Sequence, residues 1–294
     1  MDHRSFIRTL TSEQRKALTV KSNGKGLAQL AIHLGAILIV TMLIVYRIPF
    51  WPALLVLQGI LLIFLFCLMH ESVHRTPFRT RWINDAVATS CGLVLVLPPE
   101  WFRQFHFAHH RYTQDPDKDP ELASSKPNTF GEYLIYLSGF PVWKSQLSAL
   151  VNNALSPCQD SFVPVAKQQL IRAEAIGMLL LYSLLLGVSW HWQTANLLYL
   201  WLIPLILGQP FLRLYLLAEH SHCKNVTDMF ENTRTTMTHH LIYRLSWNMP
   251  YHAEHHAYPQ VPFHRLADFH TLAKPHLKVL TPGYRKFHRD YLDT

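Results

Sequence analysis

The chain has 294 residues and a net charge of +8; 49% of the residues are hydrophobic and 16% are charged. This length suits one large domain or a protein that crosses a membrane several times. Its cysteines, Cys67, Cys91, Cys158 and Cys223, include no CxxC pair, which argues against a disulfide framework, a cysteine-based zinc site or an iron–sulfur cluster.

The first part of the chain is predicted to form a membrane hairpin. Residues 1–26 are polar and basic and lack the apolar core of a cleavable signal peptide. Residues 27–46 and 50–69 are each about long enough to cross a bilayer as a helix, and a short turn joins them. This hairpin would place the N-terminus and residue 70 on the same side of the membrane.

Two further apolar segments are not expected to cross the membrane. Residues 83–99 are too short to cross twice, so they are predicted to be re-entrant or to lie in the interface. Residues 129–151 carry aromatic and aliphatic side chains with few charges and are predicted to form a helix on the membrane surface.

Residues 170–190 and 195–218 form a second predicted hairpin, with its turn at 191–194. Of the Lys and Arg residues, all but Arg47, Arg172 and Arg213 lie in 1–26, 70–169 or 219–294, on one side of this topology. Cytoplasmic loops are enriched in Lys and Arg, so these segments and both termini are predicted to be cytoplasmic. This placement of the Lys and Arg residues indicates that the net positive charge of the chain serves contact with a membrane, not with nucleic acid.

Nineteen histidines are present, and eight of them form three clusters just outside the apolar spans. His70 and His74 are four residues apart, whereas His106, His109 and His110, and again His252, His255 and His256, follow the spacing HxxHH. On a helix this spacing places the imidazoles on one face. Pro250 before the third cluster and Pro259 after it favour a short helix there.

These clusters together predict a metal site. A pair of histidines alone is more often a polar helix end, but two HxxHH copies and a pair on one side of a membrane are hard to explain in that way. Imidazole suits Zn, Cu, Fe and Ni, and eight ligands are too many for one ion and about right for two. Two adjacent redox metals suit oxygen chemistry, although the spacing does not choose iron over zinc or copper.

His70-Glu71-Ser72-Val73-His74, His106-Phe107-Ala108-His109-His110 and His252-Ala253-Glu254-His255-His256 resemble, in order and spacing, the three histidine boxes of the membrane fatty acid desaturase and hydroxylase superfamily. The resemblance implies two irons at the cytosolic membrane face, O₂ as co-substrate and a separate electron donor. It also implies a ninth ligand between the second and third boxes, for which His220 in Glu219-His220 is the first choice. His222 is the second choice, and His239 and His240 rank lower. The implied iron ligands are His70, His74, His106, His109, His110, His220, His252, His255 and His256.

Carboxylates are expected to accept hydrogen bonds from metal-bound histidines, because such histidines usually donate their second ring N–H. The candidates are Glu71, Asp85, Asp115, Asp117, Glu219 and Glu254. Asn248 could face the site through water. No side chain apart from the metal ligands is assigned a catalytic role. Arg213, within an apolar span, either snorkels to the interface or binds an acyl headgroup.

The sequence therefore predicts one domain over residues 1–294: an all-α integral membrane protein with four transmembrane helices in two hairpins and a cytoplasmic helical cap that carries a dinuclear metal site. The expected activity is that of a non-haem diiron oxidoreductase that desaturates the acyl chain of a fatty acid or membrane lipid with O₂. A hydroxylase, monooxygenase or ketolase acting on an alkane, acyl chain or carotenoid is the alternative. A metal-binding membrane adaptor or transporter, which is not an enzyme, ranks last, because the clustered histidines lie outside the spans.

No dinucleotide fingerprint or cysteine cluster points to a fused electron donor. A separate ferredoxin-, rubredoxin- or cytochrome-type donor is expected, attracted by the basic cytoplasmic face. The expected location is a bacterial inner membrane or the endoplasmic reticulum, with the histidine clusters in the cytoplasm.

Overall fold

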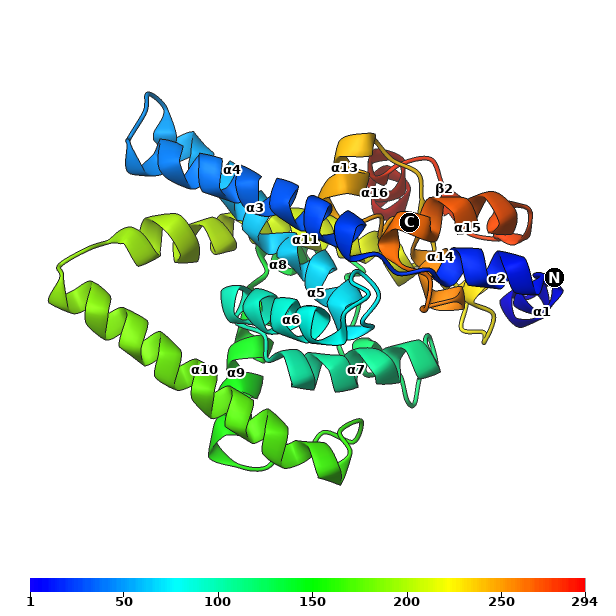
Figure 1. Ribbon diagram of the computed structural model, residues 1–294, viewed down its shortest axis with the longest axis horizontal. Helices are drawn as coiled ribbons and strands as arrows, with labels where there is room; N and C mark the ends of the chain where they lie inside the picture. The colour runs from blue at the N-terminus through cyan, green and yellow to red at the C-terminus, as the bar shows by residue number, and fades with distance from the viewer. Residues whose placement is uncertain (294) are drawn as a thin grey trace.

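The computed structural model describes residues 1–293, and their regular secondary structure is helical apart from two short parallel strands (Figure 1). The elements in chain order are α1 (His3–Thr9), α2 (Ser12–Thr19), α3 (Asn23–Val45), α4 (Trp51–Ile63), α5 (Leu65–Val73), α6 (Arg81–Leu95), α7 (Pro99–Tyr112), η1 (Pro120–Ala123), α8 (Phe130–Ser138), α9 (Phe140–Leu155), α10 (Val165–His191), η2 (Leu198–Leu202), α11 (Ile203–His220), α12 (Met229–Asn232), β1 (Thr235–Thr236), α13 (His240–Leu245), α14 (His252–Ala257), η3 (Phe263–Arg265), α15 (Leu266–Ala273), η4 (Lys274–His276), β2 (Leu280–Thr281) and α16 (Tyr284–Leu292).

Four helical stretches are long and apolar enough to cross a membrane: Ser12–Val45, Trp51–Val73, Val165–His191 and Leu198–His220. At about 1.5 Å of rise per residue, 20 residues span the roughly 30 Å hydrocarbon core. The predictions of an all-helical chain and of four candidate spans are therefore confirmed. The pairing of the spans into two hairpins and the cytoplasmic position of the cap stay predictions.

The helices α4 and α11 lie in unusually close contact. A methyl group added at Gly59 of α4 would stand 2.1 Å from the carbonyl oxygen of Pro204, and one added at Gly208 of α11 would stand 2.2 Å from that of Gly59. Only hydrogen atoms fit at this crossing, so glycine is required on both helices. Small residues that let backbones approach are typical of helix contacts in membranes. This contact fixes α11 against α4 and, with it, the position of His220 at the end of α11.

The helix α10 diverges from α11 after their connecting turn and lies against α9 (Figure 1). Ala175 and Met178 of α10 pack with Leu150 of α9, and the ring of Tyr182 meets that of Trp201 in η2 at 5.6 Å. Apart from this contact near the turn, α10 diverges from α11, whereas α3 and α4 lie side by side (Figure 1).

A sharp break separates α6 from α7, whose axes differ by 102°. Val96 ends α6 with a positive φ of 57°, and the N–H of Leu97 donates to the carbonyl of Gly92. Pro98 and Pro99 follow, and a proline at the start of α7 is compatible with a helix that begins there. The predicted re-entrant or interfacial segment at 83–99 covers most of α6 and this bend, and its depth in the membrane stays a prediction.

The predicted surface segment at 129–151 forms two helices, not one. Gly139, with φ of 71°, ends α8 and precedes α9. Phe130, Leu134 and Phe140 on these helices are exposed, which suits contact with lipid.

The N-terminal helix α1 packs on the C-terminal part of the chain. Phe6 lies against Phe230 and Phe269, with ring centroids 5.7 and 6.0 Å away, and His3 contacts the carboxylate of Asp228 at 3.2 Å. Residues 1–9 and the third histidine cluster therefore belong to one helical cap at the same end of the molecule (Figure 1).

Candidate metal centre

Four helices bring the histidines together. α5 carries His70 and is followed directly by His74, α7 carries the second cluster, α11 ends with His220, and α14 begins with His252. All nine side chains named above are buried except those of His74 and His110, which are half-buried. The helical HxxHH spacing turns each cluster toward the same point, as expected from the sequence.

The imidazoles form two neighbouring groups. In the first, the nitrogens of His70, His74, His106, His110 and His255 lie within 4.8 Å of one another, and in the second so do those of His109, His220 and His256. His252 adjoins the second group, because its Nε2 is 3.1 Å from Nε2 of His220. The rings of His110 and His256 stack at 4.0 Å, so the groups lie side by side.

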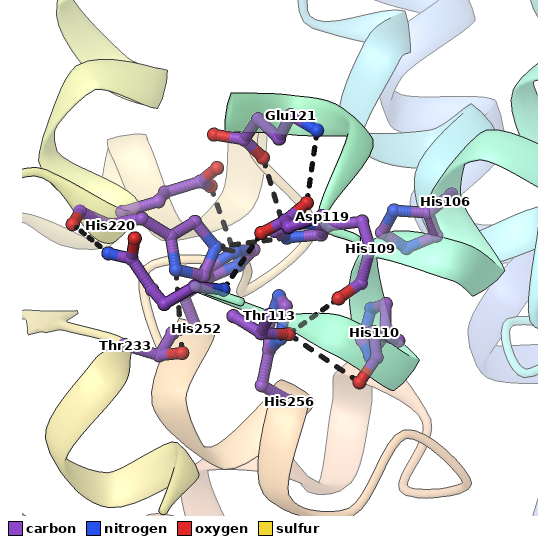
Figure 2. A network of polar contacts seen from close by, with 12 residues as sticks. His106, His109, His110, Thr113, Asp119, Glu121, His220, Thr233, His252 and His256 are labelled. Atoms are coloured by element: carbon purple, nitrogen blue, oxygen red, sulfur yellow. Dashed lines mark hydrogen bonds and ion pairs between the residues drawn. The ribbon is translucent and has the colours of Figure 1, made fainter. Parts of the chain in front are cut away.

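In the second group the outer ring nitrogens all face acceptors (Figure 2). Nδ1 of His109 faces Asp119 Oδ1 at 2.9 Å, and Nδ1 of His220 faces the carbonyl of Asn232 at 3.3 Å. The Thr113 hydroxyl donates to the His109 carbonyl, so its oxygen can accept from Nδ1 of His256 at 3.2 Å. With protons assigned to these Nδ1 atoms, the Nε2 lone pairs point inward.

The inward nitrogens stand at distances that fit metal ligands. Nε2 of His220 is 3.2 Å from Nε2 of His109 and 3.1 Å from Nε2 of His252, while Nε2 of His74 and of His106 are 2.7 Å apart. Two ligands about 2.1 Å from one ion at a right angle are about 3 Å from each other. Several buried ring nitrogens also lack hydrogen-bond partners among the described residues: His70 Nδ1, both nitrogens of His110 and His255, and His256 Nε2. The donor set therefore fits two metal ions.

Burial keeps four of these imidazoles, those of His74, His252, His255 and His256, neutral. It lowers the pKa of His74 to about 3 and holds the pKa values of His252, His255 and His256 well below the usual range, and neighbouring basic groups lower them further. Neutral imidazole is the form that binds metal, so no proton has to leave these side chains at neutral pH before an ion enters.

Two of the predicted carboxylates lie behind the third cluster. Oε1 of Glu71 is 3.4 Å from Nδ1 of His255, and Oε1 of Glu219 is 3.5 Å from Nδ1 of His252. Both nitrogens are on the far side of the ring from Nε2. These carboxylates can therefore orient the rings of histidines that present Nε2 inward.

The other predicted carboxylates do not contact the nine histidines. Asp85 pairs with Arg75 and Arg103, Asp115 pairs with Lys118, Asp117 is exposed, and Glu254 contacts His270 and Thr235. Asp85, Asp115 and Glu254 do not take the expected role because an arginine, a lysine or a different histidine lies closer, and Asp117 does not because its side chain is exposed. Sequence reasoning missed Asp119, Thr113 and the Asn232 carbonyl; the charged residues of 115–121, directly after the second cluster, are the one signal in the sequence for that loop.

The alternatives to His220 lie away from the centre. His222 is exposed and stacks on Tyr291 at 4.6 Å, and His239 and His240 are exposed. Asn248 donates to the Phe263 carbonyl at 2.9 Å, which gives it a structural role in the loop before α14. His220 is thus the one of these candidates whose ring belongs to the centre, as a member of the second group.

Comparison with known proteins identifies the family. A sequence profile described as fatty acid desaturase matches residues 49–288, which is most of the chain. The protein belongs to the membrane fatty acid desaturase superfamily. Membership makes it an oxidoreductase of lipid metabolism, and its four candidate spans agree with a membrane protein.

Individual relatives are distant. The chain is similar to the sn-1 acyl-lipid omega-3 desaturase (ferredoxin) of Nostoc sp. (strain 36), with 21% identity over 246 residues that cover 77% of this chain and 68% of the relative. It is similar to the chloroplastic omega-3 fatty acid desaturase of Glycine max, with 22% identity over 76% of this chain and 54% of that protein. A shorter match of 76 residues at 33% identity links it to the sn-1 oleoyl-lipid 12-desaturase of Picosynechococcus sp.. The chain thus spans about two thirds of the first relative's length and about half of the second's.

Proposed function

We propose that this desaturase-family protein introduces a double bond into the acyl chain of a fatty acid or membrane lipid, using O₂ at a histidine-ligated diiron centre. The observation that carries the proposal is the convergence of nine imidazoles from four helices into two adjacent groups with inward lone pairs. When bound, two redox-active irons supply the oxygen activation and the electron transfer that removal of two hydrogens requires.

The residues around the centre suit this chemistry. Phe102 stacks on His106 at 5.4 Å, and Phe66 meets His70 at 6.4 Å, so apolar rings border the first group. Such a border excludes water from the imidazoles and can contact an acyl chain. The role of the chain's own residues is to bind, orient and shield; no side chain is assigned as a general base.

The names of the relatives support the choice of desaturation and of donor. The Nostoc relative is named as an acyl-lipid desaturase that uses ferredoxin. We therefore infer a separate, ferredoxin-type electron donor and a lipid-linked acyl substrate. Basic side chains on the cap, Arg4, Arg8, Arg15 and Lys16, are exposed and would attract an acidic donor.

Replacement of His255 by alanine tests the proposal. His255 is fully buried in the first group, so its loss should lower the iron content of the purified protein and abolish new double bonds in the lipids of an expressing host. His222→Ala is the matched control, because His222 is exposed and outside the centre. Unchanged iron and unchanged double bonds in the His255 variant would overturn the proposal. Products that gain an oxygen atom, measured by mass spectrometry, would indicate hydroxylation in place of desaturation.

A further inference from the structure

The two histidine groups differ in size. The first group contains five imidazoles, His70, His74, His106, His110 and His255, whereas the second contains four, His109, His220, His252 and His256. If each group holds one ion, the second ion has one protein ligand fewer among the described residues. A further side chain with an atom able to bind metal, placed beside the second group, would give each ion the same number of protein ligands.

Glu121 provides such an atom. Its Oε2 lies 3.4 Å from Nε2 of His109, on the side where this nitrogen also faces His220 (Figure 2). Nδ1 of His109 is already engaged by Asp119, so Nε2 carries the inward lone pair. A carboxylate oxygen of Glu121 and the Nε2 atom of His220 therefore both lie close to the inward lone pair of His109, and all three atoms are acceptors.

Acceptors this close to the lone pair of His109 repel it unless a proton or a cation lies between them. In the metal-free protein, a second proton on His109 would satisfy them. In the loaded protein, the ion can do so, and the separation of 3.4 Å is close to the roughly 3 Å expected between neighbouring ligands of one ion. The same geometry thus suits a bound metal without a large movement of Glu121.

The position of Glu121 is fixed by its neighbours. Its second oxygen, Oε1, accepts from Nζ of Lys126 at 2.7 Å, which leaves Oε2 directed to the histidines. Its backbone N–H donates to Oδ1 of Asp119 at 3.0 Å, and the same oxygen engages Nδ1 of His109. One carboxylate therefore sets both the ring of His109 and the backbone of Glu121.

We propose that Glu121 is an oxygen ligand of the ion held by the second group. This proposal rests on the proposed diiron function and deepens it. One ion would have only nitrogen ligands and the other would also have an anionic oxygen. Because the carboxylate brings a negative charge, the second ion would favour its higher oxidation state relative to the first.

The test compares purified wild-type protein with Glu121→Gln, each loaded with ⁵⁷Fe. Glutamine preserves the size of the side chain and removes the anionic ligand. Glu132→Gln is the control, because Glu132 is exposed on α8. The measurements are iron per chain, the Mössbauer spectrum of the resting protein, and the rate at which a chelator removes each iron.

The wild type and the control are expected to hold two irons with two distinct quadrupole doublets. In Glu121→Gln, one doublet should shift or disappear while the other stays, and one iron should leave at least about tenfold faster. Identical spectra and release rates in Glu121→Gln and wild type would overturn the ligand assignment alone, and so would equal acceleration of both irons. Wild-type protein that binds no iron would instead overturn the diiron function on which the assignment depends.

Discussion

Glu71 and His255 face each other across the contact between α5 and α14: Oε1 of the carboxylate lies 3.4 Å from Nδ1 of the ring, and neither side chain is exposed. The other oxygen of Glu71 accepts from the backbone N–H of Phe263 at 3.0 Å and from the hydroxyl of Thr76 at 3.1 Å. One carboxylate from the second candidate span therefore contacts the third histidine cluster and accepts a hydrogen bond from the first residue of η3.

Glu71→Ala is expected to weaken metal binding without removing a ligand. The His255 ring would lose the group that orients it, and loss of such a partner typically lowers metal affinity by about 10–100-fold. The measurement is iron retention against a graded series of chelator concentrations. Asp117→Asn is the control, since Asp117 is exposed and lies outside the site. Equal retention in Glu71→Ala and wild type would show that Glu71 does not hold the ring in place.

Gly59→Ala is expected to destabilise the protein through the contact between α4 and α11. The added methyl group would stand 2.1 Å from the Pro204 carbonyl oxygen, so the two helices would have to separate. Such overpacking costs about 1–3 kcal/mol and should lower the thermal unfolding midpoint in detergent. Gly177→Ala on α10 is the control, because no atom lies within 4 Å of its added methyl group. A midpoint no lower than that of the control would contradict the close packing.

The sequence predicted the helical faces of the histidines because a period of 3.6 residues is a local property. Residues 252–257 form a short helix, and His70 and His74 stand at the end of a span, as the proline and apolar patterns indicate. The partners of the imidazoles were less predictable. Asp119 contacts His109 from ten residues away, across a loop whose path no periodicity encodes.

The arrangement of the spans, too, could be predicted only in part from the sequence. Length and apolar composition are enough to find four candidate spans, since the thickness of a bilayer sets both. They do not show which helices touch: α11 meets α4 through Gly59 and Gly208, whereas α10 lies against α9. Those contacts depend on shape at single positions, which a count of apolar residues does not contain.

Acid is expected to destabilise the metal-free protein. Burial lowers the pKa of His74 to about 3 and lowers those of His252, His255 and His256, so the unfolded chain binds more protons than the folded chain below the ordinary value of 6.5. Stability is therefore fully present above pH 6.5 and falls as the pH drops toward 3, by up to about 1.4 kcal/mol per pH unit for each histidine.

The check on this pH dependence is the unfolding midpoint of metal-free protein between pH 7.5 and 5. His255→Gln should flatten the slope, because one buried imidazole is removed, whereas the exposed-site variant His239→Gln should leave the slope as it is. A flat profile in the wild type would mean that the folded chain accepts these protons at no cost.

The membrane topology can be tested by thiol labelling of intact cells. The concentration of Lys and Arg predicts that α16 and the histidine clusters are cytoplasmic and that the turn at 191–194 is on the opposite side. Gln193 and Arg285 are exposed, so Gln193→Cys and Arg285→Cys can each be introduced in a Cys223→Ser background. An impermeant maleimide should label only Gln193→Cys before lysis. The reverse pattern would invert the predicted topology.

The basic surface of the N-terminal helices is expected to govern the rate at which an acidic electron donor associates. Arg4 and Arg8 are exposed on α1, which packs through Phe6 on the same cap as the third histidine cluster. Arg4→Glu combined with Arg8→Glu should lower turnover at limiting ferredoxin and weaken its dependence on ionic strength, because electrostatic steering acts on the association rate. Saturating donor should restore turnover, since neither side chain contacts the centre. Lys144→Glu on α9 reverses one charge at another exposed position and is the control, compared with Arg4→Glu alone so that the charge change is equal. An equal loss of turnover in this control would show that net charge, and not the α1 surface, attracts the donor.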